Sequence, residues 1–121
     1  MAASRSYRNN NPGNLEMGAF SAKCRGVLET GVKTPRFARF PHAPAGVAAL
    51  ARLLAGPTYE DRSISAAIKA FAPPKENLTN AYIAAVCKDV GIDKYMSIKS
   101  LDALQFISML HAMTKHEGYH P

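Results

Sequence analysis

Apolar side chains recur every three or four residues in four segments of the chain, all of them after residue 43, and this is the spacing of an amphipathic helix. In the first segment Val47, Leu50 and Leu54 share one face, and in the second Ile64 and Ile68 do so. Glycine or proline ends each pattern, at Gly56-Pro57, Pro73-Pro74, Gly91 and Gly118. The pattern therefore predicts helices over residues 44–54, 64–71, about 77–91 and about 100–116.

Residues 5–42 lack helical periodicity. They are rich in Asn, Gly, Pro and Arg, and the first three of these favour turns. The sequence Phe37-Ala38-Arg39-Phe40 alternates as a short strand does, so a small N-terminal loop or hairpin lobe is expected. With four helices, this lobe predicts an α+β fold that is predominantly α-helical. The length and the lack of an internal repeat predict one domain over residues 1–121.

Composition indicates a globular protein with one core, and the charge by itself does not identify the partner. Apolar residues make up 47% of the chain, which is enough for one core in a domain of this size. There are 15 Lys and Arg residues against 9 Asp and Glu residues, and the net charge of +6 favours nucleic acid, acidic lipid or bacterial cell wall as a partner. Because the basic residues are dispersed and no Trp is present, we do not expect nucleic acid.

Neither a membrane span nor a secretion signal is predicted. No apolar stretch reaches the roughly 20 residues that cross a bilayer, and the first residues lack the apolar segment of a signal peptide. We expect a protein made in the bacterial cytoplasm that does not insert into a membrane. A substrate in the cell wall would then require a pore, a virion or a secretion machine. Cys24 and Cys87 are expected as free thiols, with a disulfide as the alternative.

Glu117 is the acidic residue best placed for catalysis. It continues the apolar stripe of the last predicted helix, after Phe106, Leu110 and Met113 at steps of four, three and four residues. At the edge of a core, partial desolvation raises the pKa of a carboxyl group, and the negative end of a helix dipole acts in the same direction. Both effects suit a general acid. The alternative is a frayed helix end with Glu117 in solvent.

Four asparagines surround the Pro12-Gly13 turn, namely Asn9, Asn10, Asn11 and Asn14. Their amides offer paired donors and acceptors that suit sugar hydroxyl and N-acetyl groups, which predicts substrate contacts. Asparagine also favours turns and left-handed backbone. A purely structural role is therefore the alternative.

Four motifs resemble a family of small phage and prophage virion-associated lysins. They are RNNNPGNL at residues 8–15, RFARF at 36–40 before a helix that contains Gly46, APPKENLTNAYIAAV at 72–86, and HAMTKHEG at 111–118. Those proteins are similar to the lysozyme-like superfamily. The resemblance covers nearly the whole chain. It implies a lysozyme-like fold, bacterial peptidoglycan as the substrate, and phage tail or other virion proteins as further partners.

The chain also resembles lytic transglycosylases, in a changed order. In those enzymes a helix that ends in the catalytic Glu comes first, an Asn-Pro segment follows, and a helix with a Tyr comes late. Here Asn11-Pro12 resembles the second element and residues 76–86 the last, which implies a substrate contact for Tyr82. A helical Tyr is also typical of a core. The helix that closes near Glu117 resembles the first element, so the resemblance implies a circularly permuted order, in which Glu117 is expected beside residues 9–14.

The resemblance implies that Glu117 protonates the glycosidic oxygen between two amino sugars, through an oxocarbenium-like transition state. In a lytic transglycosylase the same Glu then acts as the base. A hydrolytic muramidase requires a second carboxylate, for which Glu29 is the candidate and Glu16 the substitute. Glu29 is alternatively an exposed hairpin charge. Neither mechanism requires a cofactor.

Metal chemistry is not expected from the four histidines, His42, His111, His116 and His120. Those at 111 and 116 are five residues apart and do not share a helix face. Two other functions stay open. A virion structural or wall-binding module would keep the amides and the charge but have no turnover. A nucleic-acid-binding protein would show steeply salt-dependent binding.

Overall fold

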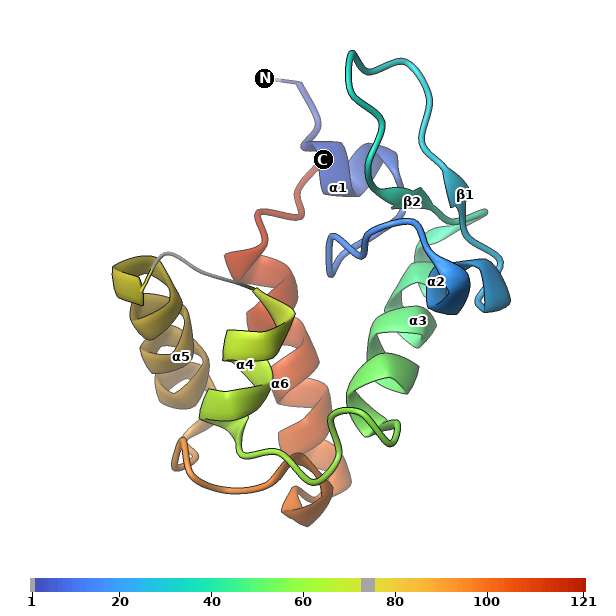
Figure 1. Ribbon diagram of the computed structural model, residues 1–121. Helices are drawn as coiled ribbons and strands as arrows, with labels where there is room; N and C mark the ends of the chain where they lie inside the picture. Colours follow the sequence, from blue (N-terminus) through green and yellow to red (C-terminus); the bar gives the residue numbers. More distant parts are fainter. Residues whose placement is uncertain (1, 73–75) are drawn as a thin grey trace. The chain divides into compact units, whose positions relative to one another are not determined.

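The structure is a computed structural model that describes residues 2–72 and 76–121. Within these residues the chain forms six α-helices, a short 3₁₀-helix and one two-stranded sheet (Figure 1). The fold is thus α+β and predominantly α-helical, as predicted. In chain order the elements are α1 (Arg5–Arg8), α2 (Ala19–Lys23), β1 (Val27–Leu28), β2 (Ala38–Arg39), α3 (Ala43–Ala55), α4 (Ile64–Phe71), α5 (Glu76–Val90), the 3₁₀-helix Ile98–Ser100 and α6 (Ala103–His116).

The four predicted helices correspond to α3, α4, α5 and α6. Ser63 caps α4 as expected, because its hydroxyl accepts from the Ala66 N–H at 3.0 Å. Gly91 and Gly118 follow α5 and α6 with φ of 73° and 74°, the left-handed conformation of a helix C-cap. The last helix begins three residues later than predicted, since residues 98–100 form the separate 3₁₀-helix. Pro73-Pro74 lies outside the described residues.

The chain divides into two compact units. One comprises the residues up to Arg52 together with Glu117–Pro121, and the other is Leu53–His116. In the first unit the predicted hairpin is present as β1 and β2, which pair antiparallel with Leu28 opposite Ala38. The short helices α1 and α2 precede it and were not predicted.

A close approach between α3 and the loop of residues 9–14 organises the first unit. We call this segment the amide loop. A Cβ atom on Gly46 would lie 1.8 Å from the backbone oxygen of Asn10, so only glycine lets the helix come this near. One turn further along α3, the buried side chain of Leu50 covers Gly13. The helix therefore fixes the position of the amide loop.

The two ends of the chain are hydrogen-bonded to each other within the same unit. The Ser4 N–H donates to the His120 carbonyl at 3.1 Å, and the His120 N–H donates to the Ser4 hydroxyl at 3.0 Å. The rings of Tyr7 and Tyr119 lie beside this contact, 5.1 Å apart between centroids. This pairing brings the residues after α6 to the start of the chain.

The second unit is built from α4, α5 and α6. Helix α5 packs along α6 and α4 packs on α5 (Figure 1). Its buried apolar side chains include Ile64, Ile68, Tyr82, Ile83, Val86, Ile98, Met109 and Met113. Backbone hydrogen bonds from Ile64 to Met96 and from Ile98 to Arg62 tie the segment before α4 to the segment before α6. No helix in the described part of the chain is long and apolar enough to cross a membrane.

Candidate active site

The amide loop is held by its own asparagines, beginning with Asn11. The Asn11 side chain is fully buried. Its Nδ2 donates to the carbonyls of Leu15 and Ala38, both at 2.9 Å, and its Oδ1 accepts from the Leu15 N–H at 2.9 Å. Both donors and the acceptor are thus satisfied by backbone groups. Asn11 links the loop to β2 and presents no group to a substrate.

Asn9 and Asn10 also serve the framework. Asn9 is buried, donates to Glu29 Oε1 at 3.0 Å and accepts from Arg39 Nε at 3.4 Å. Asn10 donates from Nδ2 to the Phe40 carbonyl at 3.0 Å and has a φ of 51°, which asparagine tolerates better than most residues. Three of the four amides therefore have the structural role that was the alternative to sugar binding.

Glu29 is buried at the centre of this framework, with 2% of its surface exposed. Arg5 donates to it twice, from Nε at 2.9 Å and from Nη2 at 2.6 Å. Asn9 and the backbone N–H groups of Arg36 and Phe37 add three more donors. The bonds from Arg5 chiefly, then those from Asn9 and the two N–H groups, hold the pKa of Glu29 far below its usual value of 4.5, although burial acts in the opposite direction.

This environment removes Glu29 from the candidate catalytic residues. Its carboxylate is surrounded by protein donors, so it has no open position for a water molecule or a sugar. The alternative of an exposed hairpin charge is also wrong, because the side chain is buried. Glu16, the substitute, pairs with Arg36 at the surface at 2.5 Å. The one signal in the sequence for this network is the four-residue spacing of Arg5 and Asn9, which lets both side chains reach the same residue, Glu29.

Glu117 lies directly after α6 and reaches the amide loop. Asn14 Nδ2 donates to both the backbone oxygen and the Oε1 atom of Glu117, each at 3.3 Å. The Glu117 residue is half-buried, and Asn14 adopts a left-handed φ of 50°. The predicted proximity of Glu117 to residues 9–14 is therefore confirmed. The helix does not fray before His116, and the turn at Gly118 follows the carboxylate.

Tyr82 lies in the second unit, on α5, and is 4% exposed. Its ring stacks on the ring of His116 at the end of α6, with 3.9 Å between centroids and 30° between planes. This position agrees with the alternative of a core tyrosine. The side chains of Glu76 and Asn77, which carry part of the same motif, lie outside what the structure describes.

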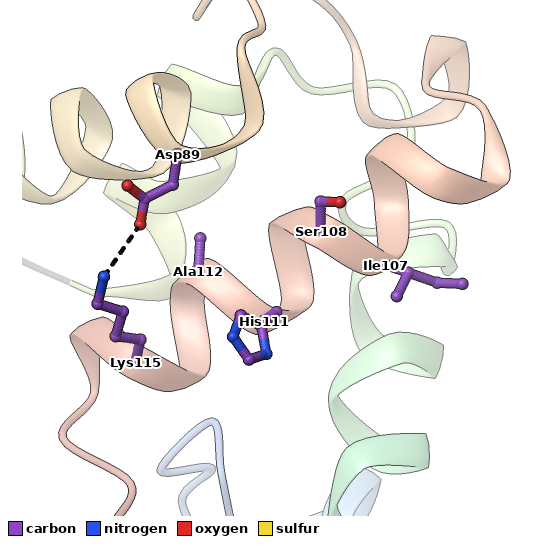
Figure 2. Close-up of a pocket in the computed structure, with 6 residues that line it drawn as sticks. All are labelled: Asp89, Ile107, Ser108, His111, Ala112 and Lys115. Carbon is purple, nitrogen blue, oxygen red and sulfur yellow. Dashed lines mark ion pairs between the residues drawn. The ribbon is translucent and has the colours of Figure 1, made fainter.

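A hollow of about 420 Å³ opens on the second unit between α5 and α6, and Figure 2 shows its lining residues. Lys115 on α6 and Asp89 on α5 approach each other across one side, 3.7 Å apart. Ser108 and His111 also line it, but no hydrogen bond joins them among the described residues. The hollow thus lacks the paired nucleophile and base that acyl transfer needs.

Comparison with known proteins leaves the glycosidase interpretation to rest on the residues themselves. No protein-family model matches the chain, and no curated protein matches it. Both cysteines are free thiols, with Cys24 buried. Among residues 2–72 and 76–121 there is no group of three His, Cys, Asp or Glu side chains arranged to hold a metal ion.

Proposed function

We propose that this protein is a lysozyme-like glycosidase that cleaves bacterial peptidoglycan, with Glu117 as its general acid and base. The observation that carries the proposal is the contact between Asn14 and the Glu117 carboxylate at 3.3 Å. It joins a half-buried acid at a helix end to an amide-rich loop, although the two are separated by 103 residues in the chain. A sugar-cleaving site needs such a pair, because the acid must be held at a fixed position beside polar groups that bind the sugar.

In the proposed mechanism Glu117 donates its proton to the glycosidic oxygen between two amino sugars as the bond breaks. The sugar whose anomeric carbon loses this oxygen then develops oxocarbenium character. The ionised Glu117 next takes a proton from the 6-hydroxyl of that same sugar, whose oxygen closes an anhydro ring. Asn14 orients the carboxylate and offers an amide to the substrate. We favour this transglycosylase route over hydrolysis because Glu29 and Glu16 are both engaged with arginines.

The resemblance to phage virion-associated lysins supports peptidoglycan as the substrate and virion proteins as further partners. Under this proposal the enzyme acts in the cell wall. The positive charge of the chain favours the anionic wall and raises the rate of encounter with it. Tyr82 remains a proposed substrate contact only through the resemblance.

The test is digestion of purified peptidoglycan, with mass spectrometry of the soluble products. The wild-type chain should release muropeptides that end in an anhydro sugar. Glu117→Gln keeps the shape and the Asn14 contact to the side-chain oxygen but cannot donate a proton, so the rate should fall by about 10²-fold or more. Glu16→Gln is the matched control and should keep full activity, because its carboxylate lies at the surface.

Two results would oppose the proposal. Unchanged activity in Glu117→Gln would assign the chemistry to another residue. Binding of the wild-type chain to peptidoglycan without any product would favour the second candidate, a non-catalytic wall-binding or virion structural module. One observation favours that candidate: Asn9, Asn10 and Asn11 serve the framework, as a purely structural protein requires.

A further inference from the structure

A basic hollow of about 320 Å³ lies in the first unit, between the turn that follows α2 and the helix α3. Lys23 at the end of α2 and Arg25 in the turn line one side, while His42 just before α3 and Arg52 in the last turn of α3 line the other. Most of the other lining residues are alanines, such as Ala45. The hollow is therefore small, with cationic side chains on both sides.

The cations of this basic hollow are not neutralised by the protein. No Asp or Glu of the described chain lines the hollow. Arg5 and Arg36 each pair with a glutamate, but Lys23, Arg25 and Arg52 take part in none of the ion pairs within residues 2–72 and 76–121. Like charges on one concave surface repel each other and raise the local positive potential. An anion that enters the hollow relieves this repulsion.

Arg25 occupies a backbone position that usually belongs to glycine. Its φ is 73°, in the left-handed region. It is the first residue after the C-cap Cys24 of α2, and Gly26 N–H donates back to the Ser21 carbonyl at 2.7 Å, which is the pattern of a Schellman motif. Glycine fits this position without strain. An arginine held there against its backbone preference points to a use for the side chain.

His42 adds a directed donor. Its Nδ1 accepts from the Ala45 N–H at 3.2 Å, at the start of α3. The ring hydrogen of the neutral form therefore sits on Nε2, which makes no hydrogen bond within residues 2–72 and 76–121. The hollow combines that donor with two guanidinium groups, whose planar forks bind two oxygens of one anion at once.

We propose that the basic hollow binds a phosphate group, either free phosphate or a phosphate monoester. Phosphate presents several charged oxygens in a compact shape, which suits a small hollow lined by two forked guanidinium groups. No aromatic residue of the described chain lines the hollow, so the stacking platform that single-stranded nucleic acid uses is missing. The site uses none of the residues of the proposed glycosidase mechanism. The two proposals can therefore be tested independently of each other.

The experiment is a titration of the full chain, labelled with a nitrogen isotope, followed by its amide chemical shifts. Glycerol 3-phosphate should shift the amides of Arg25 and Ala45 in a saturable manner. Inorganic phosphate should do the same, and a tighter fit for glycerol 3-phosphate would show that the carrier also makes contacts. Acetate at equal ionic strength should produce no saturable shift at these residues.

Two variants remove cations from the basic hollow. Arg25→Gly should lower the affinity for glycerol 3-phosphate about tenfold, since it removes a charged donor. The same variant should be at least as stable as the wild type, because glycine relieves the left-handed strain, so lost binding will not reflect lost folding. Arg52→Gln on α3 should also lower the affinity about tenfold. Lys69→Gln on α4 is the matched control: it removes one exposed helical charge that is not among the lining residues, so the affinity should stay unchanged.

Three outcomes would overturn the proposal. Equal losses of affinity for glycerol 3-phosphate in Arg52→Gln and Lys69→Gln would mean that binding depends only on the net charge of the protein. Shifts with acetate that match those with glycerol 3-phosphate would mean that the hollow has no preference for phosphate. A short DNA duplex that binds at the same residues more tightly than glycerol 3-phosphate would make nucleic acid the ligand.

Discussion

Glu29 and Glu117 occupy opposite environments although both were candidates for one catalytic pair. Glu29 is enclosed by Arg5, Asn9 and two backbone N–H groups, whereas Glu117 is half-buried and contacts Asn14 alone among the amides. The first arrangement binds a permanent anion to the framework. The second leaves the Glu117 side chain with part of its surface open to solvent and with Asn14 as its amide neighbour.

Replacement of Glu29 should destabilise the fold without touching the proposed chemistry. In Glu29→Gln an amide NH₂ group would face donors that now point at a carboxylate oxygen, and Arg5 would lose its charged partner. Glu29 is buried but the Arg5 side chain is partly exposed, so the loss should be about 2 kcal/mol at neutral pH, below that of a fully buried pair. Urea denaturation measures the loss, with Glu16→Gln as the matched control because its pair with Arg36 is exposed.

The stability lost in Glu29→Gln should also depend on pH. The pKa of Glu29 is lower in the folded chain than its usual value of 4.5, so the folded state binds the proton more weakly than the unfolded state does. Its stabilisation is therefore fully present above that value and is lost as the pH falls below it. The difference in unfolding free energy between wild type and Glu29→Gln should shrink in acid. A difference that stays constant from neutral pH into strong acid would be incompatible with this account.

Sequence reasoning at this scale reached Glu117 and Asn14 but not the network around Glu29. Apolar residues that recur about once per helical turn are visible in the chain, and this spacing placed Glu117 on the stripe of Leu110 and Met113. The bond between Arg5 and Glu29 joins residues 24 positions apart through a hairpin whose register no local pattern specifies. The burial of Asn9 and Asn11 also depends on contacts between distant parts of the chain, so the sequence did not show which asparagines would be buried.

At the scale of elements, Gly46 sets how closely α3 approaches the amide loop. Gly46→Ala should improve the helix propensity by about 1 kcal/mol. Against this, the added Cβ would lie 1.8 Å from the Asn10 oxygen, so backbone must move and the net result should be a loss of about 2 kcal/mol or more. Thermal unfolding checks the prediction. Gly18→Ala is the control, since its Cβ meets nothing within 4 Å, and equal stability of the two variants would contradict the proposed contact.

Element bounds were predictable where the apolar stripe was long. Residues 44–54 and 64–71 were predicted within a residue of α3 and α4, because each stripe ends at a clear Gly, Pro or cap. The helices α1 and α2 have only four and five residues. Such short helices are not stable alone and form because the surrounding chain holds them, so they carry no periodic signal.

At the scale of the whole molecule, the hydrogen-bonded chain ends should allow a circular permutation, in which the old ends are joined and the chain is opened elsewhere. A permutant that joins Pro121 to Ala2 through a short Gly-Ser linker and opens between Gly31 and Val32 should fold with nearly the stability of the wild type. The linker spans ends that already lie together, and a Cβ on Gly31 would meet nothing within 4 Å. Circular dichroism during denaturation tests this. A permutant opened inside α6, between Met109 and Leu110, should fail to fold.

The pairing of Ser4 with His120 has a practical consequence for work with this protein. An affinity tag attached to either end of the chain begins within three residues of the contact between Ser4 and His120, and Glu117 lies three residues before His120. Assays of the tagged chain would then measure the proposed site with an extra peptide attached close to Glu117 in the sequence. Removal of the tag by a protease before any assay on cell wall material avoids this interference.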